Sequence, residues 1–120
     1  MNIFGLFGKH SEQQKTNKAV IDALIKAGEK IDEEHLIELA FFGTWKRMSL
    51  LKNELLGKGY EEIVGQTDKM LIVSKMFKLN FDLINNLTEK MEQLAKKYDV
   101  EFDGWSTYPT TKIKNRKANS

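Results

Sequence analysis

The sequence predicts an α+β protein with a ferredoxin-like split β-α-β sandwich, in which a four-stranded antiparallel sheet packs against two helices and an extra N-terminal helix precedes it. Apolar and polar side chains alternate over residues 35–42, as in a half-buried strand. Apolar side chains recur at close to 3.6-residue spacing over residues 81–98, as in an amphipathic helix. The predicted order is strand–helix–strand–strand–helix–strand, and two such units joined by a hairpin give the split arrangement.

The extra helix is predicted over residues 12–27. Ser11 and Gln14 have the spacing of a capping box, in which the hydroxyl accepts from the third amide while the glutamine reaches back. Apolar side chains then follow at helical spacing. Gly28 can adopt the left-handed conformation that ends a helix. The first strand follows this helix.

The middle of the chain is predicted to form a second helix and two strands. Thr44 is a suitable N-cap for this helix, and Gly57 closes it. A short second strand is predicted over residues 60–64, and residues 65–68 have the chemistry of a turn. The apolar run over residues 70–77 is short and follows a turn, which predicts a central strand rather than a helix.

The last helix and strand have the clearest signals. Asn80 is predicted to cap the helix over residues 81–98. A strand then starts at Val100, where apolar and acidic residues alternate. Gly104 permits a bend or a bulge in this strand, and Pro109 prevents further ladder hydrogen bonds.

Length and composition predict one domain. The chain has 120 residues, with 19 Lys and Arg against 17 Asp and Glu and a net charge of +2, which is too balanced to indicate nucleic-acid binding. We expect a flexible apolar stub over residues 1–10, a single domain over 11–109 and a disordered basic tail over 110–120. The absence of cysteine agrees with a reducing compartment. No apolar run approaches the roughly 18 to 20 residues that cross a bilayer, so we expect no stable membrane insertion and a cytoplasmic location.

The sequence offers little for catalysis or cofactor binding. Its histidines, His10 and His35, lack the close carboxylate or histidine spacing of a metal site. No glycine-rich phosphate loop stands between a strand and a helix. We therefore predict a protein that is not an enzyme and has no catalytic residues, no metal and no cofactor. His35 is a weak candidate ligand or base, and the alternative is a hydrogen-bonded residue at a strand end.

An RNA-binding module is the alternative function, because common RNA-binding domains share this split topology. Such domains stack bases on aromatic side chains of a central strand, and the central strand here offers only Phe77, at its end. Four basic side chains in the tail are able to contact phosphates without specificity. They are Lys112, Lys114, Arg116 and Lys117. Direct nucleic-acid binding is thus the less favoured prediction.

The last strand carries the most informative residues. If Val100 and Phe102 face inward, strict alternation places Asp103 and Trp105 together on the other face. A tryptophan on the open face of a sheet leaves a large apolar surface to be covered. Either the first helix or a partner protein covers it, since tryptophan is also a favoured interface anchor.

At this point the sequence resembles a known family, the regulator of ribonuclease E activity B (RraB) family. The resemblance rests on Leu94–Tyr98, which reads LA-x-x-Y at the end of the long helix, and on the Asp103-Gly104-Trp105 motif that follows. Upstream, the strand start His35–Glu38 and the L-x-x-x-G-Y turn at Leu55–Tyr60 also match. The similarity covers roughly residues 17–109.

The resemblance implies a ferredoxin-like sandwich without catalytic activity. It also implies a protein inhibitor that binds ribonuclease E or a similar RNA-decay protein and so alters RNA turnover. We expect the partner to contact Asp103, Trp105, Glu101, Glu38 and His35. In this interpretation Trp105 anchors the partner, while Asp103 binds backbone amides of its own bend or of the partner.

Overall fold

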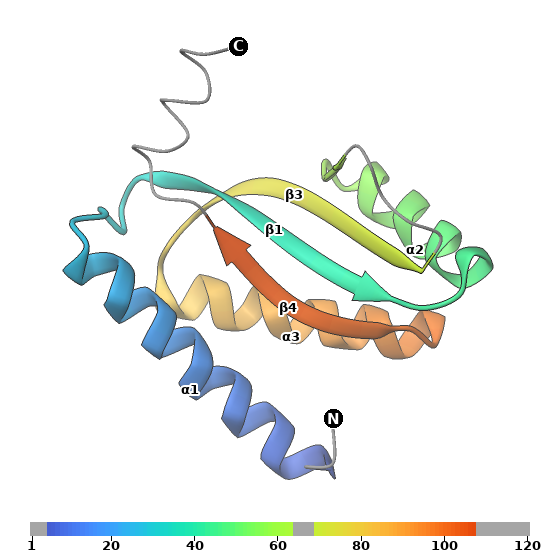
Figure 1. Cartoon of the computed structure of the whole chain (residues 1–120), viewed down its shortest axis with the longest axis horizontal. Coiled ribbons are helices and arrows are strands. Elements are labelled where there is room, and N and C mark those ends of the chain that lie inside the picture. Colours follow the sequence, from blue (N-terminus) through green and yellow to red (C-terminus); the bar gives the residue numbers. More distant parts are fainter. Residues whose placement is uncertain (1–4, 64–68, 108–120) are drawn as a thin grey trace.

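The computed structural model describes residues 5–63 and 69–107. Three helices and a four-stranded sheet are arranged as in Figure 1. Their order along the chain is α1 (Gly5–Lys26), β1 (Glu34–Phe42), α2 (Trp45–Gly57), β2 (Glu61–Glu62), β3 (Met70–Lys78), α3 (Phe81–Tyr98) and β4 (Glu101–Thr107). The strand order in the sheet is β2-β3-β1-β4, and each neighbouring pair is antiparallel. This confirms the predicted ferredoxin-like fold class.

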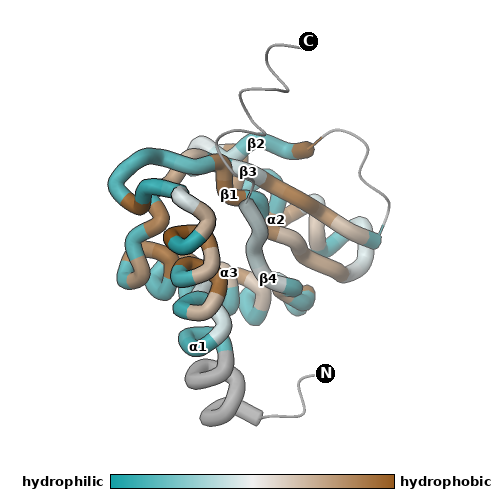
Figure 2. Tube along the Cα trace, turned by 60° about the vertical axis from the view of Figure 1, so that its left-hand side comes forward, coloured by the Kyte–Doolittle hydropathy of each residue, from teal (hydrophilic) through white to brown (hydrophobic). Residues whose placement is uncertain are grey.

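The hydrophobic core lies between one face of the sheet and the helices. Alternate residues of β1 face it, and Ile37, Leu39 and Phe41 are fully buried. Leu71 and Val73 lie on the same face of β3. The helices contribute Met48, Leu51 and Leu55 from α2 and Ile84, Leu87, Met91 and Ala95 from α3. Figure 2 shows the matching pattern, because the central strands are mostly hydrophobic whereas the edge strand β2 is hydrophilic.

Helix α3 has the bounds predicted from the sequence. The Asn80 side chain accepts from the amides of Asp82 and Leu83, which satisfies donors that a helix start leaves free. At the other end Asp99 is left-handed, with φ 55°, and the Val100 amide donates to the Ala95 carbonyl at 2.9 Å. These local contacts explain why the ends of this helix could be predicted.

Helix α2 is joined to α3 by one carboxylate, that of Glu54. Its Oε1 accepts from Lys97 Nζ at 2.8 Å and from the Tyr98 hydroxyl, and its Oε2 accepts from Lys58 Nζ at 2.9 Å. The hydrogen bond from Lys97, with those from Tyr98 and Lys58, lowers the pKa of the Glu54 carboxyl from 4.5 to about 2. Thr44 caps the start of α2 as predicted, since its hydroxyl accepts from the Arg47 amide.

Helix α1 differs most from its prediction. It begins at Gly5, not near residue 12, so Ser11 lies inside the helix rather than at its cap and part of the expected stub is helical. Its end agrees with the prediction, because Gly28 has φ 95°. The sequence left the place of this helix open. The structure packs it against α3, on the same side of the sheet as the core.

The second strand is also shorter than predicted, because β2 comprises only Glu61 and Glu62. Parts of other predictions, namely residue 64, the turn over 65–68, Pro109 and the basic tail over 110–120, lie outside the described residues. Among the residues that are described, none of the helices combines the length and apolarity required of a membrane span.

Candidate functional site: the last strand and the uncovered face of the sheet

Strand β4 contains a bulge at the residues that the sequence singled out. Ala40 of β1 pairs with Gly104, but the next residue, Phe41, pairs with Phe102, so Asp103 is an extra residue on β4. Gly104 has φ 116°, a conformation that costs glycine little and strains other residues. The sequence correctly allowed a bend here, and the bend is a β-bulge.

The bulge turns Trp105 to the covered face of the sheet. Trp105 pairs with Leu39, and paired residues on neighbouring strands point to the same side. Phe102 is also buried on that side, where its ring lies 5.2 Å from the ring of Phe41. Strict alternation was therefore the wrong assumption, and Asp103 and Trp105 do not share a face.

Helix α1 covers Trp105, which was one of the two outcomes that the sequence left open. The Trp105 indole Nε1 donates to Asn17 Oδ1 at 2.7 Å, and the ring packs half-buried against the core. Asn17 is fully buried, and its Nδ2 donates to Asn85 Oδ1 at 2.7 Å and to Thr88 Oγ1 at 3.1 Å. One amide thus joins α1, α3 and β4, and a satisfied buried network of this kind fixes how elements pack.

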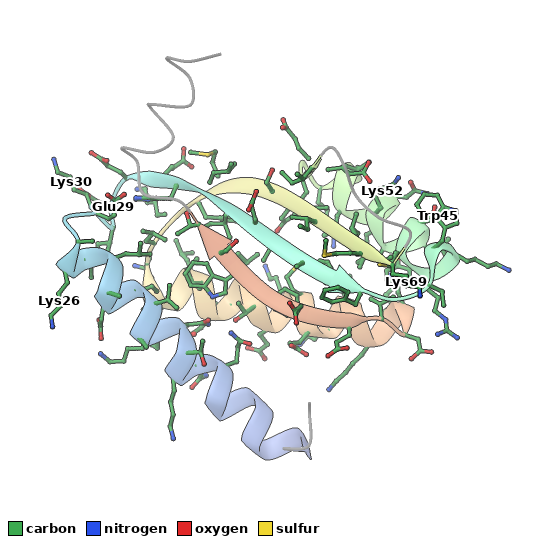
Figure 3. All side chains as sticks on the ribbon, in the orientation of Figure 1. Lys26, Glu29, Lys30, Trp45, Lys52 and Lys69 are labelled. Atoms are coloured by element: carbon green, nitrogen blue, oxygen red, sulfur yellow. The ribbon has the colours of Figure 1, made fainter. Side chains whose placement is uncertain are left out.

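His35 is buried on the same side of the sheet. Its side chain has no exposed area, its Nδ1 lies 2.9 Å from the Glu33 carbonyl, and its Nε2 lies 3.1 Å from Glu29 Oε1. Both ring nitrogens thus lie within hydrogen-bond distance of an oxygen atom. Figure 3 shows Glu29 in the loop between α1 and β1. His35 therefore fastens this loop to the first strand.

The remaining predicted residues gather on the uncovered face. Glu38 pairs with Ser74 on one side and with Ser106 on the other, so it points away from the helices. Glu101 pairs with Phe42 on that same face, and Glu101 and Asp103 are both exposed. In Figure 1 the sheet is seen from this side, with α3 behind it.

Apolar side chains accompany these acids. Across β1 and β3, Leu36 pairs with Met76 and Phe42 pairs with Met70 on the uncovered face. Met76 is 45 % exposed and Phe42 is 37 % exposed. Glu61, from the edge strand, pairs with Ser74 and adds another exposed acid. We call this surface, formed by these residues with Glu38, Glu101 and Asp103, the acidic sheet face.

Comparisons with known proteins place this chain in a family. The family model described as "Regulator of ribonuclease activity B" (RraB) matches residues 14–107 of the chain. The chain belongs to the RraB family. It is 30 % identical over 109 residues to the "Regulator of ribonuclease activity B" of Salmonella typhi. This alignment covers 81 % of this chain and 77 % of that relative. It is 29 % identical to the Escherichia coli (strain K12) protein of the same name, over 81 % of this chain and 77 % of the relative.

In this RraB-family chain two residues of the Asp-Gly-Trp motif have structural roles. Gly104 permits the bulge, and Trp105 holds α1 through Asn17. Among the side chains that the structure describes, no three His, Asp or Glu residues gather as metal ligands would.

Two features of the site were missed in the sequence. Asn17 lies one helical turn before the buried Ile21, so a polar residue stands on the apolar side of α1 and signals a buried polar contact. Trp45 is the other tryptophan, and at 59 % it is the most exposed large hydrophobic residue in the described part of the chain. Lys52 Nζ lies 5.3 Å from its ring centroid, at the α2 end of the molecule in Figure 3. Nothing in the sequence alone shows that Trp45 is more exposed than Trp105.

Proposed function

We propose that this protein is a non-catalytic regulator that binds ribonuclease E or a related RNA-decay enzyme in the cytoplasm and modulates RNA turnover. Membership of the RraB family supports a ribonuclease as the partner, because the relatives carry the name of ribonuclease regulators. A regulator that acts by binding needs an accessible surface rather than converging catalytic groups. The acidic sheet face provides such a surface.

The acidic sheet face is the observation that carries the proposal. Glu38, Glu101 and Asp103 come from two adjacent strands and lie around exposed apolar side chains. A surface with this composition suits a partner segment that is basic and partly apolar, since opposite charges steer association and apolar contacts hold it. Of the five residues expected to bind the partner, these three are accessible. His35 is fully buried, and Trp105 is half-buried against α1.

A binding experiment tests the proposal. Ribonuclease E from the same organism is passed over the immobilised 120-residue protein, and the dissociation constant is measured by surface plasmon resonance. We expect Glu38→Lys/Asp103→Lys to weaken binding by about tenfold or more, because reversed charges repel a basic partner segment. The matched control, Asp32→Lys/Glu89→Lys, makes the same charge change at exposed residues that do not belong to the acidic sheet face and is expected to bind like the wild type.

An activity assay completes the test. Cleavage of a fluorogenic RNA by ribonuclease E is expected to slow when wild-type protein is added, and the protein alone is expected to cleave nothing. Binding that is absent, or equally weakened by both double variants, contradicts the proposal.

The alternative of an RNA-binding module gains no support from the described residues. Phe77 pairs with the buried His35, so it points to the helix side of the sheet rather than to the open face where such modules stack bases. The basic tail lies outside the described residues.

A further inference from the structure

A second surface, of opposite charge, lies on the other side of the sheet. It is a groove of about 730 Å³ between α3, the second half of β3 and the segment after α2. We call it the lysine groove. In Figure 1 α2 lies beside the beginning of β3, while the end of β3 runs on towards the start of α3. The groove shows that the helix side of the sheet is incompletely covered at this edge.

The floor of the lysine groove is apolar. The lining includes Tyr60, Phe77, Leu83, Leu87, Met91 and Leu94. Leu83, in the first turn of α3, is 47 % exposed, whereas Leu87 and Met91 are buried beneath the surface. An exposed leucine beside partly covered apolar side chains is the arrangement that receives apolar side chains of a partner.

The rim of the groove is basic. Lys58, Lys75, Lys90 and Lys97 line it, and its described lining contains no aspartate or glutamate. Glu54 lies nearby and binds Lys58 and Lys97, which offsets part of this charge and also holds both ammonium groups in place. The Lys90 side chain is exposed and makes no hydrogen bond or ion pair with any described residue. A positive potential over an apolar floor attracts negatively charged groups.

The aromatic side chains of the groove argue against nucleic acid as its ligand. Lys75 Nζ lies 5.0 Å from the ring centroid of Tyr60 and 5.8 Å from that of Phe77, and it donates to the Lys58 carbonyl at 2.9 Å. Tyr60 is only 8 % exposed. Bases bind single-strand sites by stacking on open ring faces, and this lysine occupies the ring faces here.

We propose that the lysine groove binds a short acidic segment of a partner protein that also carries apolar side chains. The apolar side chains contact the floor around Leu83, and the acidic side chains contact Lys90 and Lys97. From Leu83 to Lys97, α3 is roughly 20 Å long at about 1.5 Å per residue. A helical partner segment with about the same number of residues has the same length. This proposal is independent of the acidic sheet face and of the identity of the ribonuclease.

A designed peptide tests the proposal with the full chain. The probe is a fluorescein-labelled 14-residue peptide with leucine at helical positions i, i+3, i+4 and i+7 and glutamate elsewhere, and binding is measured by fluorescence anisotropy. Backbone amide shifts in ¹⁵N NMR spectra then locate the peptide. We expect the largest shifts along the groove-facing residues of α3 and at Tyr60, and affinity that falls as salt rises.

Two variants of the same helix separate site binding from general charge attraction. Lys90→Glu is expected to weaken peptide binding by about tenfold. Lys96→Glu makes the same charge change at an exposed residue of α3 outside the groove lining and is expected to change affinity by less than about twofold. Leu83→Asp is expected to weaken peptide binding because it removes an apolar contact from the floor of the groove. Equal effects of Lys90→Glu and Lys96→Glu, or shifts centred elsewhere, overturn the proposal.

Other occupants give different results. A single-stranded oligouridylate that displaces the peptide and binds more tightly overturns the assignment to a protein segment. Sedimentation that shows a dimer, dissociated by Lys90→Glu, assigns the groove to a second copy of this chain and also overturns it. Ribonuclease binding that persists in Lys90→Glu shows that the two surfaces act separately, as we expect.

Discussion

At the scale of single residues, the bulge at Asp103 and Gly104 decides what the Asp-Gly-Trp motif does. One extra residue in β4 places Asp103 outward and Trp105 inward. The two prominent residues of the motif therefore have different roles. Trp105 is part of the buried contact between β4 and α1, whereas Asp103 is available to a partner. Trp45, at 59 % exposure, is the more exposed of the two tryptophans.

The two tryptophans predict different effects of the same substitution. Trp105→Phe removes the indole donor to Asn17 Oδ1, which among the described residues then accepts only from Gln13. We expect a loss of about 1 kcal/mol in the free energy of unfolding, the usual contribution of one hydrogen bond. Trp45→Phe, at a site that is 59 % exposed, is the control and is expected to change stability by less than about 0.5 kcal/mol. Urea denaturation measures both values, and equal losses would contradict the role assigned to Trp105.

At the scale of elements, single polar side chains determine how the helices are joined. Asn17 joins α1 to α3 and β4 from a fully buried position. Glu54 joins α2 to α3 near the surface. The first contact resists water because it is buried, whereas the second depends on charge and therefore on pH.

The contact at Glu54 predicts a difference in pH dependence. Its pKa is lowered from 4.5 to about 2 in the folded protein, so the folded state holds the proton less tightly than the unfolded state. The resulting stability is fully present above about pH 4.5 and is lost as the pH falls towards 2. We expect the wild type to exceed Glu54→Gln in unfolding free energy at pH 6, by an amount that shrinks at pH 3. Denaturation at both pH values checks this, and a gap that stays constant would contradict it.

At the scale of the whole molecule, the two sides of the sheet differ in their charge and in whether helices cover them. The acidic sheet face has no described helix over it, and the lysine groove lies on the helix side at the β3 edge. The net charge of +2 conceals this separation. A molecule built this way is suited to contact two segments of opposite charge, because each surface attracts the charge that complements its own.

The sheet as a whole predicts where the protein is most stable. Strand β1 is paired on both sides, with β3 and β4, whereas β2 forms only two pairs at the edge. We expect the amides of Ile37 and Leu39 to exchange with solvent most slowly and those of β2 to exchange fastest within the sheet. Hydrogen exchange followed by NMR measures this order. Similar protection in β1 and β2 would show that the edge of the sheet is more stable than its pairing indicates.

The sequence by itself determined the order of the elements, the fold class and the bounds of α3. These properties depend on local patterns, such as the apolar spacing of α3 and the side chain of Asn80, which contacts its own neighbours in the chain. Glu38, Glu101 and Asp103 were also identified as candidates for contact, and the structure leaves them accessible on one face.

Tertiary structure alone decided the direction of Trp105, the place of α1 and the burial of His35. Each depends on residues far away in the sequence: Trp105 on its pairing with Leu39 and its bond to Asn17, and α1 on its packing against α3. A bulge exists only relative to the strand beside it, so alternation within one strand cannot reveal it. The walls of the lysine groove come from three separate segments of the chain. Because their proximity arises only in the folded protein, the sequence alone could not predict this groove.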